Sequence, residues 1–303
     1  MKRCSSHACG STLMLVLWAL ILLSAVIFAW VRVIDGGIDV VNAANRGMEA
    51  RALAHSGLAV ALHSGVTINS PHLRSSFDGQ HSYRVTIESE GARLNLNYFL
   101  AGGDPAKILF LKQYLALRGL EFKEREVFMD CLLDWVSPTG KVHRLNGVTE
   151  GPDYQPPHRP LQSLDEIALI KGSGPLVSQA HWMDDLTLYS SGPLDIESAP
   201  AELMALVPGI GAQRAQRFVK IREERKFQEA NKDGYPFKNL AEALSYLGLS
   251  PQQFSELSGF LSFRDNVLHI HSEGESGKAK RQVDAVVRKT QEATGQILLW
   301  KED

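Results

Sequence analysis

The sequence predicts an α+β protein with three parts: an apolar N-terminal helix that spans a membrane, an antiparallel sheet, and a large helical domain inserted within that sheet. An uncharged apolar run extends from Gly10 to Val31. Alternating apolar and polar residues, typical of strands, occur near 83–98 and again near 267–287. Between these regions, glycine and proline divide the chain into short segments with helical spacing.

The apolar run is long enough to cross a bilayer. About twenty residues at a rise of about 1.5 Å cover a hydrocarbon core of about 30 Å. Trp18 and Trp30 lie near its two ends, where aromatic side chains favour the headgroup layer. The small residues of the leader MKRCSSHACG come before the run, whereas a secretory signal peptide has them after it. We therefore predict a transmembrane helix at 11–33.

The leader and the apolar run together resemble a prepilin, in which a peptidase cuts on the cytoplasmic side and leaves the apolar helix as the new N-terminus. The resemblance implies cleavage between Gly10 and Ser11, so that residues 1–10 form the leader. An uncleaved anchor is the alternative. Because ten residues are too few to be the working part, we expect a single-pass membrane protein with its C-terminal domain outside the cytoplasm. The resemblance implies that the membrane is the inner membrane and that this domain lies in the periplasm.

The composition is that of a folded exported domain. The chain is 44% hydrophobic and 22% charged, with a formal net charge of −2 over 303 residues, which gives no reason to expect a nucleic-acid partner. Of its three cysteines only Cys131 lies beyond the leader, so the mature chain has no partner for an internal disulfide. The sequence contains no metalloprotease, nucleophile-elbow or P-loop motif, and we predict no enzymatic activity.

Periodicity predicts the elements that follow the membrane. Apolar residues in 40–62 have helical spacing, so the transmembrane helix is expected to continue as an amphipathic arm. Alternation at 83–87 and, after Gly91, at 94–98 predicts a strand, a turn and a second strand. The C-terminal segment alternates again, which predicts two or three strands that rejoin the first ones. The expected parts are an arm with first strands at 34–98, an inserted helical domain at 99–260 and completing strands at 261–303.

Three stretches of the insert share one pattern. In each, an acidic residue lies near a helix start, apolar residues follow at helical spacing, and a glycine suited to positive φ ends the helix. The three stretches are SLDEIALIKG, AELMALVPGIG and AEALSYLGLS. The pattern predicts helix-hairpin-helix-like units within one compact domain.

The second hairpin carries residues suited to binding phosphate. Gly209 and Gly211 allow a tight turn, so the amides from Ile210 onward can point at a phosphate, with Arg214 and Arg217 nearby. A membrane-anchored DNA-binding protein of competence type is therefore an alternative. The other two hairpins lack cations after the turn, so we favour a structural hairpin and expect no nucleic acid. A free-standing membrane-anchored interaction module is a third hypothesis, and it predicts an uncut N-terminus.

Several pieces in order resemble one family, the type II secretion system protein K, the largest minor pseudopilin. They are CGSTLMLVLWALILLSA, ESEGARLNLN, LLDWVSPTGKVHRLNGVTEGPDY and LDIESAPAELMALVPGIG. The resemblance covers nearly the whole chain and implies a pilin-like fold. It also implies a role at the tip of a short pseudopilus that exports folded proteins across the outer membrane. The implied partners are minor pseudopilins of the I and J types, the major pseudopilin, the prepilin peptidase and the secretion machinery.

The fifth residue after the implied cleavage site supports a tip position. Most pilins have a glutamate there, whereas this chain has Leu15. An acid at membrane depth costs roughly 2.5–3.5 kcal/mol, and in the pilus model the amine of a neighbouring subunit offsets that cost. A subunit with no neighbour above it has no such amine to meet. A bitopic anchor that simply prefers leucine is the alternative.

The resemblance also implies calcium in the acidic loop. Asp134, Glu150 and Asp153 are the expected oxygen ligands, since calcium takes six to eight oxygens. Where the family has further acids, this loop has VSPTGKVH. An ordinary solvated loop therefore remains the alternative, and calcium is the one cofactor considered.

Overall fold

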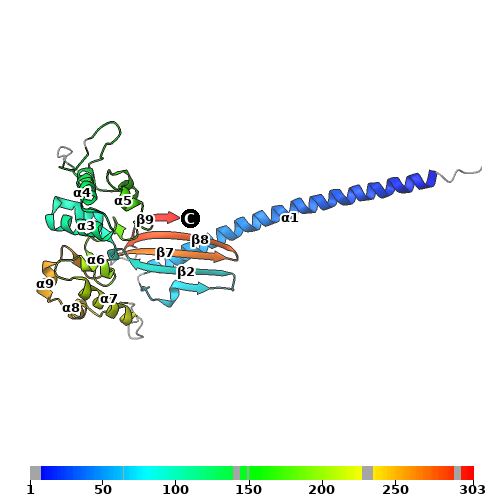
Figure 1. The fold of residues 1–303 in the computed structure, drawn as a ribbon. Coiled ribbons are helices and arrows are strands. Elements are labelled where there is room, and N and C mark those ends of the chain that lie inside the picture. The colour runs from blue at the N-terminus through cyan, green and yellow to red at the C-terminus, as the bar shows by residue number, and fades with distance from the viewer. Residues whose placement is uncertain (1–7, 64, 139–143, 149, 227–234, 290–294) are drawn as a thin grey trace, which may run out of the picture.

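The computed structural model describes residues 8–63, 65–138, 144–148, 150–226, 235–289 and 295–303. Most of the predicted leader lies outside these residues. Helix α1 (Ala8–Leu62) is continuous through Gly36 and Gly37 and projects far from the rest of the molecule (Figure 1). From Thr12 onward it is long and apolar enough to cross a membrane, and its apolar window is not buried against the protein.

The other helices and strands divide between a sheet and an insert. The helices are α2 (Leu96–Leu100), α3 (Pro105–Leu117), α4 (Phe122–Val136), α5 (Gly174–Val177), α6 (Ala201–Ala205), α7 (Ala212–Lys226), α8 (Leu240–Leu247) and α9 (Pro251–Glu256). The 3-10 helices are η1 (Pro71–Leu73), η2 (Glu90–Ala92), η3 (Ala101–Gly103) and η4 (Leu164–Leu169). The strands are β1 (Arg74–Ser76), β2 (His81–Ser89), β3 (Leu94–Asn95), β4 (Leu186–Thr187), β5 (Leu194–Asp195), β6 (Leu261–Ser262), β7 (Val267–Ser276), β8 (Ala279–Arg288) and β9 (Gln296–Glu302).

An antiparallel sheet packs on the C-terminal half of α1. Its strand order is β1-β2-β7-β8-β9, so strands far apart in sequence, β2 and β7, are neighbours. The buried face of the helix presents small residues, among them Ala54 and Ala61, to alternate strand residues such as Val85 and Ile270. A side chain at Gly274 would collide with the backbone of Ala50, so glycine allows α1 and β7 to approach closely.

The helical domain is inserted between β2 and β7 and has a hydrophobic core of its own. It lies at the end of the sheet opposite to the projecting part of α1 (Figure 1). Aromatic rings form its centre: Phe99 and Phe110 stack at 4.9 Å between centroids, and Phe218 and Phe237 at 5.3 Å. Two short parallel pairs, β3–β4 and β5–β6, connect its parts.

The predicted α+β organisation, with an apolar N-terminal helix, an antiparallel sheet and a helical insert, is confirmed. One local expectation is wrong: residues 94–98 do not form a hairpin with β2. Strand β3 pairs with β4 instead, and α2 begins directly after it. The Asn95 side chain accepts a hydrogen bond from Tyr98 N and caps this helix. The chain therefore leaves the sheet after Ser89 and returns to it at Val267.

Candidate functional site

Two of the motifs that support the resemblance meet where the insert joins the sheet. Gly91 of ESEGARLNLN packs against Asp195 of LDIESAP and against Asp265, which lies just before β7. A Cβ at Gly91 would lie 2.7 Å from the Cβ atoms of both aspartates. Only glycine fits this contact without a shift of its neighbours. We call Gly91, Asp195 and Asp265, with the residues they contact, the joint.

Asp195 is the most heavily bonded residue of the joint. It is 3% exposed, and its Oδ1 accepts hydrogen bonds from Glu197 N and Arg264 N, each at 3.0 Å. Its Oδ2 accepts from Ser89 Oγ at 3.2 Å and from Asp265 N at 3.3 Å. One carboxylate thus links the end of β2, the LDIESAP turn and the chain that enters β7.

Burial changes the acidity of two neighbouring carboxyl groups. Burial raises the pKa of Asp265, whose two oxygens accept from Ser191 N and Val267 N, both at 2.9 Å. Burial also raises the pKa of Glu197, although Arg264 donates to it at 2.8 Å. These groups lie in a cleft of about 430 Å³ between sheet and insert. Asp265 binds two backbone N–H groups and Glu197 binds the Arg264 side chain, so we assign both a structural role.

On the sheet face beside the joint, a charged cluster surrounds the buried Glu90. His269 lies with its Nδ1 3.0 Å from Glu90 Oε1 and its Nε2 3.5 Å from Asp284 Oδ1. Arg93 Nη1 donates to Glu90 at 2.8 Å. The contact with Glu90 raises the pKa of His269 despite burial. Burial acts to raise the pKa of Glu90, but the bonds from His269 and Thr187, together with Arg93, hold it below its usual value.

The asparagines of ESEGARLNLN bind inside the insert. Asn95 Nδ2 donates to Ser190 O at 2.8 Å. Asn97 Nδ2 donates to Leu161 O at 2.8 Å, and its Oδ1 accepts from Leu161 N at 2.9 Å. The two asparagines therefore bind backbone groups of distant segments and hold the parts of the insert together.

The predicted hairpin lies between α6 and α7. Gly209 and Gly211 have φ of +81° and +74°, as a tight turn requires, and Ile210 is buried. Arg214 donates to Gly209 O at 3.2 Å, while Arg217 is exposed. The turns at Gly172 and Gly248 also have positive φ.

Two basic residues of α7 make contacts inside the insert. Arg222 is 3% exposed and donates to Ile196 O at 3.1 Å and to Ala199 O at 2.7 Å. Arg225 contacts Glu242 at 2.6 Å. These bonds attach the second half of α7 to the LDIESAP turn and to α8, which fits a structural hairpin.

The structure does not bring the three expected calcium ligands together. Asp134 is 8% exposed and its Oδ2 accepts from Arg144 N at 3.2 Å, while Glu150 Oε1 lies 3.0 Å from His158 Nε2. Asp153 is exposed. Within the described ranges, no three His, Cys, Asp or Glu side chains are arranged to hold a metal ion. Asp134 and Glu150 each lie beside a basic residue, Arg144 and His158, rather than beside further acids.

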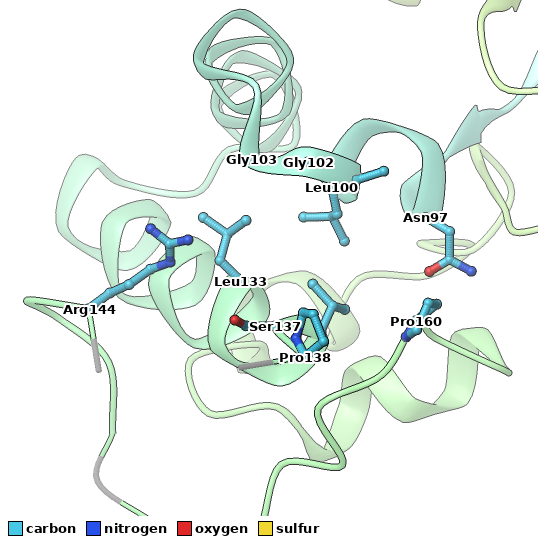
Figure 2. Close-up of a pocket in the computed structure, with 11 residues that line it drawn as sticks. Asn97, Leu100, Gly102, Gly103, Leu133, Ser137, Pro138, Arg144 and Pro160 are labelled. Atoms are coloured by element: carbon cyan, nitrogen blue, oxygen red, sulfur yellow. The ribbon is translucent and has the colours of Figure 1, made fainter. Parts of the chain in front are cut away.

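A cleft of about 440 Å³ lies beside this loop. Leu133, Pro138 and Pro160 surround it, with Arg144 on one side and Asn97 on the other (Figure 2). The end of α4, the η3 turn and the loop before η4 all contribute to its walls. The sequence carried no signal for this cleft, because its lining comes from four separate segments.

The residues of the predicted cleavage site, and the fifth residue after it, lie on the projecting part of α1. Gly10 and Ser11 are helical within α1, and Leu15 is 67% exposed on it. Cleavage between Gly10 and Ser11 remains a prediction.

No known protein-family model matches the chain, and no curated protein matches it either. Among solved structures, the chain is similar to one chain of the GspK-GspI-GspJ complex of the type 2 secretion system from enterotoxigenic Escherichia coli. The TM-score is 0.56 at 12% sequence identity, and the match covers 89% of this chain and 98% of that chain. The two chains share one fold. The resemblance to a K-type minor pseudopilin is thereby confirmed at the level of fold.

Proposed function

We propose that the protein is a minor pseudopilin of a type II secretion system that caps the pseudopilus tip and helps to initiate its assembly. The observation that carries the proposal is the position of the insert at the end of the molecule opposite to the apolar part of α1 (Figure 1). In a filament of parallel helices, that end faces the next subunit above. A domain of this bulk would collide with a subunit stacked there. A subunit that caps the filament avoids this collision, because no subunit lies above it.

The apolar part of α1 supplies the assembly surface. Its large side chains, including Leu15 at 67%, are exposed along the helix before the sheet begins. Lipid covers them in the membrane, and the helices of neighbouring subunits cover them in a bundle. We infer that the I- and J-type pseudopilins pack there, and that the major pseudopilin is added below. A leucine at position 15 needs no amine from a subunit above.

The proposal includes a membrane topology and a mechanism of assembly. The prepilin peptidase removes residues 1–10 on the cytoplasmic side of the inner membrane, and the sheet and insert lie in the periplasm. A preformed tip complex lowers the barrier to extracting the first major subunits from the bilayer. The growing pseudopilus then pushes folded proteins through the outer membrane.

Copurification tests the role. The full chain, extracted in mild detergent, is expected to retain I- and J-type pseudopilins. A polar substitution in the exposed helix, such as Leu22→Asn, should weaken that complex more than Leu169→Asn, a similarly exposed leucine of the insert. Recovery of the chain alone from solubilised membranes, with both pseudopilins expressed, would contradict the proposal.

The competence-type DNA-binding function remains a second candidate because of the positive φ of Gly209 and Gly211 and the exposed Arg217. Phosphate contacts would make DNA retention fall steeply with salt. The pair of substitutions Arg214→Glu and Arg217→Glu should abolish such retention, while Lys123→Glu with Lys238→Glu serves as a charge-matched control. We expect no retention by the wild-type chain even at low salt.

A further inference from the structure

Two turns form the end of the sheet from which α1 emerges. The β1–β2 turn, Phe77–Gln80, and the β7–β8 turn, Gly277 with Lys278, lie side by side because β2 pairs with β7. A hydrogen bond of 2.8 Å from Gly277 N to Gln80 O joins them. The β7–β8 turn also approaches α1: a Cβ at Gly277 would lie 3.7 Å from the Cδ of Arg46. Both turns therefore face the side on which the apolar helix departs (Figure 1).

Cations predominate at this end. Arg46, Lys278 and Arg281 are exposed, and none of them forms an ion pair within the described part of the chain. Arg46 and Arg281 both lie beside the helix–turn contact, since a Cβ at Gly47 would lie 3.4 Å from Arg281 Nη2. These charges are close in space although they come from two distant segments.

The acids at the same end share two bases, His81 and Lys280. Asp78 Oδ2 lies 2.7 Å from His81 Nδ1, and Glu49 Oε2 lies 3.4 Å from His81 Nε2. Glu275 Oε1 lies 3.7 Å from Lys280. The hydrogen bonds to Asp78 and Glu49 raise the pKa of His81, which favours its charged form. Because four acids, Glu273 included, share these two bases, Arg46, Lys278 and Arg281 leave this end with a small positive excess.

An exposed aromatic ring accompanies the cations. Phe77, at the start of the β1–β2 turn, is 63% exposed although it is large and apolar. Aromatic rings combined with Lys and Arg are typical of surfaces that lie at the headgroup layer of a membrane.

We infer that Phe77, Arg46, Lys278 and Arg281 form a docking surface, here called the headgroup surface, for the anionic phospholipid headgroups of the bilayer that α1 spans. The inference rests on the membrane-anchored part of the proposed function. It assigns a lipid partner to a surface that subunit packing along the apolar helix does not require. Negative phosphate groups complement the unpaired cations, and the interfacial layer accepts the phenylalanine ring.

The geometry of α1 permits this contact. Arg46 lies 14 residues beyond Arg32, where the apolar run ends, which corresponds to about 21 Å of helix. An upright helix would hold the turns roughly 15 Å above a headgroup layer about 6 Å thick. A tilt toward the sheet of about 40°, the upper end of the usual range, lowers the turns to within reach of a Lys or Arg side chain.

Two acids on the intervening helix oppose the contact. Asp35 and Asp39 are exposed between the apolar run and Arg46. They would approach the same headgroups when the helix tilts. The headgroup surface is therefore a weak, reversible contact that holds the domain down on the bilayer, and partner subunits can lift it when the tip complex forms.

The test uses the full chain in nanodiscs with and without phosphatidylglycerol. A donor dye on Gln80→Cys, with the leader cysteines Cys4 and Cys9 changed to serine and Cys131 buried, reports energy transfer to headgroup-labelled lipid. We expect more efficient transfer with phosphatidylglycerol than with neutral lipid, and the difference should shrink as salt screens the charges. The triple variant Arg46→Glu, Lys278→Glu, Arg281→Glu should reduce the docked population by at least about tenfold.

Matched controls separate the effect of the headgroup surface from the effect of the net charge of the chain. The remote triple variant Lys123→Glu, Arg217→Glu, Lys238→Glu should keep the transfer, and Asp39→Asn should increase it. Equal transfer with neutral lipid, or equal loss in both triple variants, would overturn the inference while leaving the pseudopilin proposal intact. Loss of the chain from the nanodisc would overturn both, because it would remove the membrane anchor.

Discussion

Replacing Asp195 tests whether the joint holds the insert on the sheet. Asp195→Ala removes the acceptor of three buried or half-buried backbone N–H groups, those of Glu197, Arg264 and Asp265. An unsatisfied buried donor costs about 1–3 kcal/mol, so the three together predict a loss of roughly 3–5 kcal/mol in the free energy of unfolding, after partial access of water. For a chain of this size the melting temperature should fall by about 10 °C.

The matched variant is Asp195→Asn. Its carbonyl oxygen still accepts from Glu197 N and Arg264 N, but its amide faces the N–H of Asp265, so the loss should be about 1–2 kcal/mol. Urea unfolding of the full chain in mild detergent, followed by tryptophan fluorescence, measures both variants against wild type. A loss below about 1 kcal/mol for Asp195→Ala, or equal losses for the two variants, would refute the reasoning.

Three further predictions concern single features of the structure. Gly91→Ala places a Cβ 2.7 Å from two others and should destabilise the chain by about 1–3 kcal/mol in the same urea assay, whereas Gly151→Ala, with open space and no positive φ, should cost less. Because the pKa of His269 is raised in the folded state, its contribution to stability is complete below its ordinary pKa of 6.5 and is lost as pH rises through the folded value. His269→Gln should therefore flatten that part of the stability–pH curve, and an unchanged slope would count against the Glu90 contact. Since Arg144 and His158 occupy the acidic loop, adding calcium or a chelator should leave the melting curve unchanged, and a clear rise in melting temperature with calcium would show that the loop binds it.

Elements with strong periodicity could be predicted from the sequence. The apolar run, the alternation of β2, β7 and β8, and the glycine-ended helices are all local patterns that follow from burial on one face. Residues 94–98 show the limit of this reasoning, because alternation over five residues fits both a strand and a capped helix. The Asn95 cap decides between them, and it depends on the distant Ser190 carbonyl.

The joint could be located from the sequence only in part. ESEGARLNLN and LDIESAP stand out as motifs, but nothing local shows that Gly91 contacts Asp195 and Asp265, about 100 and 170 residues away. The calcium ligands show the opposite case. Asp134 and Glu150 are close enough in sequence to suggest a site, yet each pairs with a nearby base instead. For the joint, contacts between distant segments therefore decide what local patterns leave open, whereas in the acidic loop the nearby bases decide it.

The most direct test of the account is the N-terminus of the mature protein. Intact mass and N-terminal peptide sequencing of the membrane-extracted chain, with and without the prepilin peptidase, distinguish a pilin-class subunit from a simple anchor. A pilin-class subunit should begin at Ser11 only when the peptidase is present. A chain that still begins at Met1 in the presence of the enzyme would contradict that expectation and would favour the anchored DNA-binding or interaction module.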